Sequence, residues 1–214
     1  MITTHALSLA TLAEQLHDEE IHVWRLGYQA ASGRAPLYAV LAAYLGCDVA
    51  DVRLVEGAHG RPALAPGHGS TLQFNWSHSG PHALIAVARR VSPGIDVERR
   101  RPRPRALQIA RRFFAADELA LLSRLPAAAR EPAFLQLWTA KEAIVKALGR
   151  GLAFGLDRLS VGWIDRRLAL LRLDGGEVRD WRLHALPGAD DATAAIAWRG
   201  EARHIRVGTL ASGA

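Results

Sequence analysis

The chain has 214 residues, of which 50% are hydrophobic and 22% charged, so its composition is that of a globular protein and excludes a disordered one. The net charge of +6 indicates an anionic partner or substrate, such as nucleic acid, an acidic protein, a polyphosphate or an anionic membrane surface. The single cysteine, Cys47, excludes an internal disulfide and fits a reducing compartment. Because neither a signal-peptide pattern nor an apolar run of ~18 residues is present, we expect a cytoplasmic protein without a membrane span.

The first half of the sequence mixes strand patterns with one helix pattern. Alternating or short apolar runs predict strands at 21–26, 52–55, 72–76, 83–88 and 93–98. Residues 33–46 predict a helix, because Pro36 falls in its first turn and Gly46 can end it. Glycine and proline mark residues 56–62 as a loop.

A basic segment broken by prolines, residues 99–105, is the one candidate linker. Helices are predicted after it at 106–114, 117–125 and 131–149, and strands at 158–164, 168–173, 178–186, 193–198 and 203–208. This order predicts an α+β fold with an N-terminal subdomain (1–100) and a C-terminal subdomain (101–214), whose tail frays from about residue 209.

The helix at 131–149 carries the chain's only lysines. The 27 cationic residues comprise 25 Arg and two Lys, and Lys141 and Lys146 both flank Glu142. An ammonium is a compact point charge suited to phosphate oxygens, unlike the planar guanidinium. An ordinary surface ion pair between Glu142 and Lys146 is the alternative, since they are four residues apart. The clustering of both lysines favours a functional helix.

Asp96 and Glu98 alternate on a predicted strand, so their carboxylates leave the same face. Such a pair can be a strand end running into solvent. It can also form a Mg²⁺ site if folding brings Glu142 near, since hard oxygen ligands suit this ion. No zinc-type spacing of His and Cys is present.

Two further segments could contact phosphate. His78 ends a predicted strand among hydroxyl residues, where it could donate to a phosphate or be structural. The turn Gly60-Arg61-Pro62 presents a cation on a rigid backbone. No nucleophile-elbow pattern surrounds Ser77 or Ser79, so no Ser/His/Asp triad is predicted.

In their order, these segments resemble the 4′-phosphopantetheinyl transferase superfamily, in its Sfp-type class. The matching motifs are Gly-Arg-Pro (60–62), Phe-Asn-Trp-Ser-His-Ser (74–79), Gly-Ile-Asp-Val-Glu (94–98), Phe-Phe-Ala-Ala-Asp-Glu (113–118) and Leu-Trp-Thr-Ala-Lys-Glu-Ala-Ile-Val-Lys-Ala-Leu-Gly-Arg-Gly-Leu (137–152). Each motif is weak alone, but five in this order are specific.

The resemblance implies a Mg²⁺-dependent enzyme that transfers the 4′-phosphopantetheine arm of coenzyme A to a serine of an apo acyl or peptidyl carrier protein and releases 3′,5′-ADP. It implies a monomer of two similar α/β subdomains, each a small antiparallel sheet packed with a long helix, related by pseudo-two-fold symmetry. An acidic carrier and an anionic cofactor would both complement the charge of +6.

The resemblance also assigns catalytic and metal-binding roles. Asp96, Glu98 and Glu142 match the family's Mg²⁺ ligands. Glu142 further matches the carboxylate proposed to deprotonate the serine, and Lys146 matches a lysine on the diphosphate. Glu118 is an auxiliary candidate.

Substrate contacts are implied in the same way. His78 matches a histidine that binds coenzyme A phosphates, and Arg61 stands where the family usually has a lysine near the nucleotide. Arg34 is the candidate for the 3′-phosphate, and Ser77, Lys141 and Lys146 complete the set.

Two other functions remain open. A nucleic-acid-binding module without catalysis is motivated by residues 99–105 and by the pI near 10.4. Aromatic residues are not interleaved with this basic run, as a stacking surface would need. A binding partner that has lost activity is disfavoured by the intact set of carboxylates.

Overall fold

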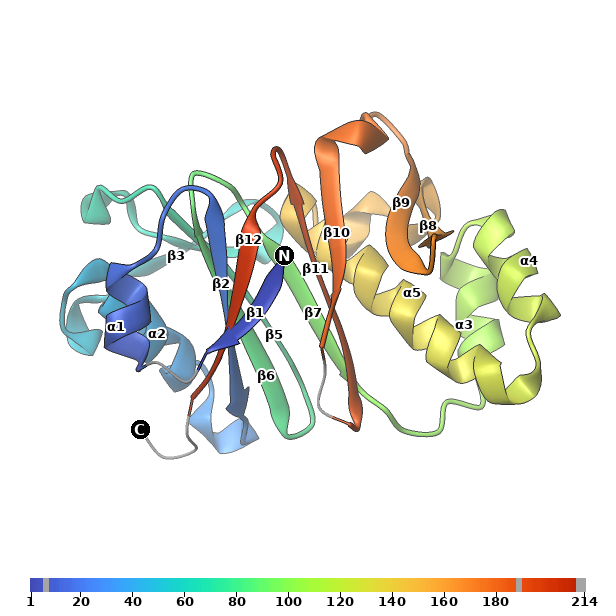
Figure 1. Cartoon of the computed structure of the whole chain (residues 1–214), viewed down its shortest axis with the longest axis horizontal. Coiled ribbons are helices and arrows are strands. Elements are labelled where there is room, and N and C mark those ends of the chain that lie inside the picture. The colour runs from blue at the N-terminus through green and yellow to red at the C-terminus, as the bar shows by residue number, and fades with distance from the viewer. Residues whose placement is uncertain (6–7, 188–189, 211–214) are drawn as a thin grey trace.

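The computed structural model describes residues 1–5, 8–187 and 190–210, and it shows the mixed α+β protein that the sequence predicts (Figure 1). Its α-helices are α1 (Leu9–Glu14), α2 (Ala35–Leu45), α3 (Ala106–Phe113), α4 (Ala116–Arg124) and α5 (Ala127–Leu148). Its strands are β1 (Ile2–His5), β2 (Glu20–Gly27), β3 (Leu54–Glu56), β4 (Pro62–Leu64), β5 (Leu72–Ser79), β6 (His82–Arg89), β7 (Gly94–Arg99), β8 (Leu159–Ile164), β9 (Arg167–Leu173), β10 (Trp181–Leu186), β11 (Ala192–Arg199) and β12 (His204–Thr209). None of the helices described is long and apolar enough to cross a membrane.

The described strands form two larger sheets and two hairpins. One sheet has the order β1-β12-β2-β6-β5 and the other β10-β11-β7, while β3 pairs with β4 and β8 with β9. Figure 1 shows α1 and α2 outside the first sheet and α5 outside the second. Separate cores lie between α1–α2 and the first sheet, between the two sheets, and between the second sheet and α3–α5. The layers are therefore helix, sheet, sheet, helix.

The two halves of the chain repeat one order of elements. The first runs β2, α2, the β3–β4 hairpin, β5 and β6; the second runs β7, α5, the β8–β9 hairpin, β10 and β11, with α3 and α4 added after β7. The sheet orders β2-β6-β5 and β7-β11-β10 correspond, and all these pairs are antiparallel.

Two strands tie the halves together across residue 100. β7 precedes that position but pairs with β11, and the last strand, β12, lies parallel to both β1 and β2 in the first sheet. The division at residue 100 stays a prediction. Fraying from about residue 209 is wrong for the residues described, because Thr209 belongs to β12 and Leu210 N donates to Arg25 O at 2.8 Å. Residues 211–214 lie outside the described part.

The predicted helices and strands are present, and most differences lie at their ends. Helix α5 begins at Ala127, four residues before its predicted start, because Pro132 costs only one intrahelical hydrogen bond and does not break the helix here. The guanidinium of Arg130 donates to the carbonyls of Leu122 and Leu125 and so joins α5 to the end of α4. The sequence does not predict β1, α1 or β4, and residue 62, which the sequence pattern assigns to a loop, begins β4. Strand β1 is short, and its neighbour among the described strands comes from the far end of the chain.

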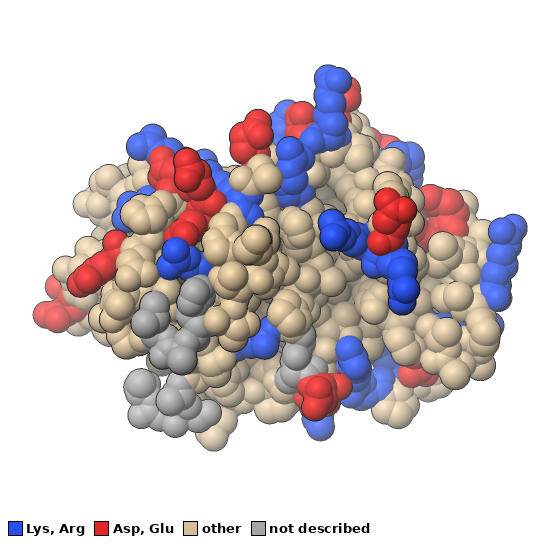
Figure 2. Space-filling model, viewed as in Figure 1, with Lys and Arg blue, Asp and Glu red and all other residues tan. Residues whose placement is uncertain are grey.

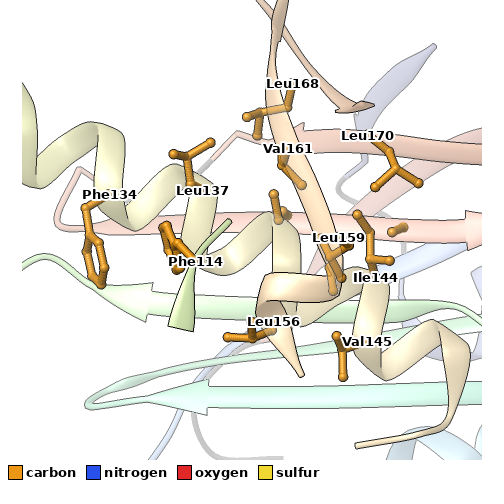
Figure 3. Packing of buried hydrophobic residues seen from close by; sticks show 14 of the residues in the cluster. Phe114, Phe134, Leu137, Ile144, Val145, Leu156, Leu159, Val161, Leu168 and Leu170 are labelled. Carbon is orange, nitrogen blue, oxygen red and sulfur yellow. The ribbon is translucent and has the colours of Figure 1, made fainter. Parts of the chain in front are cut away.

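Helix α5 packs on two sides. Its aliphatic residues Leu137 and Ile144 face the β8–β9 hairpin in a core that also holds Phe114 and Phe134 (Figure 3). Its alanine face lies against β7 at Gly94. A Cβ at Gly94 would stand 1.9 Å from Ala143 O and 2.4 Å from Ala147 N, so only glycine fits there.

Replacing Gly94 by alanine should therefore force α5 away from β7. We expect Gly94→Ala to lower the free energy of unfolding by about 3 kcal/mol, as overpacking does. Urea denaturation measures the change. Gly67→Ala is the matched control, since nothing lies within 4 Å of a Cβ there, and it should shift stability by less than about 0.5 kcal/mol. Equal effects of the two substitutions would contradict the close approach.

Candidate active site

The edge strands of the two sheets meet side by side, joined by side chains. Asn75, Ser77 and Ser79 alternate along β5 and point to β7. Asn75 Oδ1 accepts a hydrogen bond from Ile95 N at 2.8 Å, and Ser77 Oγ accepts one from Val97 N at 3.4 Å. These acceptors satisfy backbone donors on the edge of β7 that β11 does not reach. The site is thus built across the joint between the halves.

Asp96 leaves β7 toward α5 and meets Lys146 there. Lys146 Nζ lies 2.7 Å from Asp96 Oδ1 and donates to Ile95 O at 3.0 Å. Ser77 Oγ donates to the same carboxylate oxygen at 2.8 Å. Burial raises the pKa of Asp96, while Lys146 and Ser77 counteract that rise. The second oxygen, Asp96 Oδ2, is buried and has no hydrogen-bond partner among the described residues.

Glu98 lies two residues further along β7 and is also held. Its Oε2 accepts from Ser79 Oγ at 3.0 Å and from Arg103 Nη2 at 2.6 Å. The side chain of Arg103 is only 18% exposed. Arg103 therefore anchors residues 99–105, the segment predicted as a linker, to the site.

Glu142 lies one helical turn before Lys146 and is half-buried. Burial, with Asp96 and Glu98 adding to it, raises the pKa of Glu142 to about 7, against the opposing effect of Lys146. Folding thus places the three carboxylates within electrostatic range of one another. Across the described ranges, no group of three or more His, Cys, Asp or Glu side chains is arranged to hold a metal ion.

A cavity of about 210 Å³ opens beside Lys146, lined also by Arg61 and Trp76. Arg61 Nη2 donates to Phe74 O and Pro93 O at 3.0 Å each, and Nη1 donates to Lys146 O. Burial lowers the pKa of Arg61. Arg61 therefore fastens its loop to β5 and to the end of α5 while it lines the cavity.

A second cavity, of about 190 Å³, adjoins the first through Gly60 and Pro62, which line both. Arg34, at the N-terminus of α2, lines it together with Tyr38. The structure thus places Arg34 in a separate cavity that shares Gly60 and Pro62 with the cavity of Arg61 and Lys146.

His78 is exposed on the opposite face of β5 from the serines. Its ring stacks on Tyr28 with centroids 4.4 Å apart and tilts against Trp76 at 5.1 Å. Sequence reasoning missed Tyr28, Trp76, Asn75 and Ser79. The alternation within residues 74–79 could have found the last three, since it sends Asn and Ser to one face and the aromatic rings to the other.

Lys141 and Glu118 do not join this cluster. Lys141 is fully buried, and its ammonium pairs with Glu118 and donates to Leu159 O at 2.7 Å. Glu118 also accepts from the backbone of Ala115 and Val161, both at 2.9 Å. An ammonium enclosed in this way cannot touch a substrate, so the prediction of a substrate contact for Lys141 is wrong. Its charge is used to join α5 to α4 and β8.

Comparison with known proteins identifies the family of the chain. A family model described as the 4′-phosphopantetheinyl transferase superfamily matches residues 92–197. The 4′-phosphopantetheinyl transferase HetI of Nostoc sp. is 35% identical over 170 residues, which cover 79% of this chain and 70% of that protein. The chain belongs to the 4′-phosphopantetheinyl transferase superfamily.

Two further relatives are similar to this chain over much of its length. The protein slr0495 of Synechocystis sp. is 35% identical over 173 residues, covering 77% of this chain and 69% of that protein. The 4′-phosphopantetheinyl transferase Sfp of Bacillus subtilis is 31% identical over 148 residues, 68% of this chain and 60% of its own. The protein is therefore a phosphopantetheinyl transferase, and the nucleic-acid-binding alternative is not supported. On the face seen in Figure 2, Lys and Arg alternate with Asp and Glu and form no continuous basic surface.

The two lysines of this transferase should respond differently to removal of their charge. Lys141→Met leaves Glu118 as an uncompensated buried charge and should cost about 3–5 kcal/mol of stability. Lys146→Met should cost less, because the side chain of Lys146 is 26% exposed. Chemical denaturation compares the two.

The double variant Glu118→Gln with Lys141→Met removes both buried charges and keeps an amide oxygen for the backbone donors. We expect it to be more stable than Lys141→Met alone. A larger loss from Lys146→Met than from Lys141→Met would contradict the assignment of Lys141 to the core.

Proposed function

We propose that this transferase moves the 4′-phosphopantetheine arm of coenzyme A to a serine hydroxyl of an apo acyl or peptidyl carrier protein and leaves 3′,5′-ADP. The observation that supports this most directly is the contact of Lys146 with Asp96 beside a cavity, with Glu98 and Glu142 in electrostatic range. Transfer of a phosphoryl group from a diphosphate requires positioning and neutralisation of charge more than covalent assistance. A cationic ammonium between buried carboxylates and a cavity fits that requirement.

The carboxylate chemistry of the same residues suits a divalent cation, although in the described part of the chain their side chains are not arranged around a metal position. Asp96 Oδ2 is buried with no hydrogen-bond partner in the described part of the chain, and the carboxylates of Asp96 and Glu98 both raise the pKa of Glu142. Among the described residues, Lys146 pairs with Asp96 and Arg103 pairs with Glu98, which leaves Glu142 without an ion-pair partner, and hard carboxylate oxygens suit Mg²⁺. We assign Asp96, Glu98 and Glu142 as the residues that would hold it. When bound, Mg²⁺ would neutralise charge on the diphosphate and on the leaving group.

Glu142 is the proposed general base. With a pKa raised to about 7, it can take the proton of the carrier serine near neutral pH. The serine oxygen then bonds to the phosphorus that carries the pantetheine arm. The bridging P–O bond breaks, and 3′,5′-ADP leaves with the electron pair. Lys146 uses two donors on Asp96 and Ile95 O, so a third remains for a diphosphate oxygen.

The remaining substrate contacts are proposed along the two adjoining cavities. Arg61 and Arg34 line them and supply positive charge for the nucleotide end. His78 is exposed beside Tyr28 and Trp76, where its ring nitrogens can donate to a phosphate. Ser77 is proposed to act through Asp96, since its hydroxyl is already engaged there.

We further propose that the enzyme is a cytoplasmic monomer whose halves are related by pseudo-two-fold symmetry. The repeated order of elements and the matching sheet orders support this relation. The site then lies where the edge strands of the two halves meet.

The catalytic role of the carboxylates is tested by isosteric amides. Glu142→Gln and Asp96→Asn should abolish transfer to an apo carrier in the presence of Mg²⁺ and coenzyme A, because base and metal ligands are lost. Mass spectrometry of the carrier measures the transfer. Glu131→Gln, the same change near the start of α5, is the control and should leave transfer intact.

Measurements of melting temperature distinguish a catalytic and metal-binding role of Glu142 from a structural role. Glu142→Gln removes the repulsion from Asp96, so its melting temperature without divalent ions should equal or exceed that of the wild type. Addition of Mg²⁺ should stabilise the wild type and not the variant. Full carrier modification by either amide variant would refute the assignment.

An acidic carrier is expected to meet the exposed arginines of residues 99–105. Arg101 and Arg105 are exposed, whereas Arg103 is held by Glu98. Charge reversal in Arg101→Glu with Arg105→Glu should weaken carrier binding about tenfold at low salt and leave coenzyme A binding unchanged. Calorimetry with each partner measures both. Unaltered carrier affinity would place the carrier elsewhere.

A further inference from the structure

A cavity of about 440 Å³ opens at one end of the layer between the two sheets, and the proposed reaction does not use it. It lies where the ends of β2, β7 and β12 meet the starts of β6 and β11, in the lower middle of Figure 1. Apolar side chains line its inner part, among them Leu84, Val97 and Ala194, which belong to the core between the sheets. Its volume lies within the range of small-molecule sites.

Among the described residues that line this cavity, one charged side chain takes part in no ion pair. Arg25 follows Ile21 and Val23 on the same face of β2, so its side chain continues an apolar row of the inter-sheet layer. Arg25 Nη2 is buried, and among residues 1–5, 8–187 and 190–210 it has no hydrogen-bond partner. Burial lowers the pKa of Arg25 below its ordinary value. The side chain of Arg25 is only partly buried, but its buried Nη2 lacks a partner among the described residues, and an anion that accepted a hydrogen bond from it would remove the cost of leaving that donor unpaired.

Asp191 lies close to two other basic side chains near the cavity. His82 Nε2 is 2.8 Å from Asp191 Oδ1, without the geometry of a hydrogen bond, and Arg99 Nε is 3.6 Å from Asp191 Oδ2. Among the described residues that line the cavity, Arg25 is therefore the basic side chain that takes part in no ion pair. The fork of a guanidinium binds a carboxylate through two parallel hydrogen bonds, and one net positive charge matches one negative charge.

We propose that this cavity is a binding site for an amphipathic monocarboxylate, with its apolar chain against Leu84, Val97 and Ala194 and its carboxylate on Arg25. The site is distinct from the proposed catalytic centre. Val97 lines the cavity, whereas its neighbours Asp96 and Glu98 leave the other face of β7. The occupant therefore lies behind the strand that carries the proposed metal ligands, and it does not depend on coenzyme A.

Binding of octanoate tests the site. Octanol, which lacks the carboxylate, and acetate, which lacks the long alkyl chain, are the comparison probes. In calorimetry, octanoate should bind the wild-type protein more tightly than either probe, and it should raise the melting temperature. Arg25→Met should weaken octanoate binding at least tenfold, while Arg101→Met, at an exposed arginine, should leave it unchanged. Arg25→Met should itself be no less stable than the wild type, because it removes an uncompensated charge.

A second variant keeps the charge of Arg25 and fills the apolar part of the cavity. Ala194→Leu fills the apolar part of the cavity and should abolish octanoate binding with Arg25 in place. Coenzyme A at saturating concentration should not displace octanoate. Equal octanoate affinity in the wild type and Arg25→Met, undiminished binding by Ala194→Leu, or displacement by coenzyme A would each overturn the proposal.

Discussion

Helix α5 lies so close to strand β7 that a hydrogen atom alone fits at position 94, and the geometry of the site depends on this contact. Because side chains alternate along a strand, Asp96 leaves the same face as Gly94 and points to the helix. The helix presents Glu142 and Lys146 one turn apart on the side that meets β7. The distance between strand and helix therefore decides whether the ammonium reaches the carboxylate at all.

The same closeness makes the site electrostatically unfavourable on its own. Asp96 and Glu142 are both desolvated, and Lys146 is the ammonium that offsets them. Such a cluster persists only where the surrounding structure supplies the stability. On its other side, α5 carries the fully buried pair of Lys141 and Glu118 within a large apolar core. The helix is thus fixed by a compensated pair on one side, while on the other side Lys146 lines the cavity and lies next to the less compensated carboxylates.

The local sequence pattern correctly predicted the features of the site that depend on local backbone geometry. Alternation placed Asp96 and Glu98 on one face, and composition singled out the helix with both lysines. The role of Arg61 could not be predicted, since its acceptors lie on three segments far apart in the chain. Strand β1 was missed for the same reason, because among the strands that the structure describes it pairs with β12, at the far end of the chain. What the sequence left open was in each case set by contacts between distant segments.

The two lysines show why charge alone is an incomplete guide. Lys141 was inferred to serve phosphate, yet it is enclosed by Glu118, Leu159 O and the ring of Phe114, 5.0 Å away. The five donors of a guanidinium could not all be satisfied in that space, whereas an ammonium needs only three partners. Lys146 meets the opposite situation, with two donors engaged and its side chain lining a cavity. In a chain that otherwise uses arginine, the small size of the ammonium suits both positions, and we propose a substrate contact for Lys146 alone.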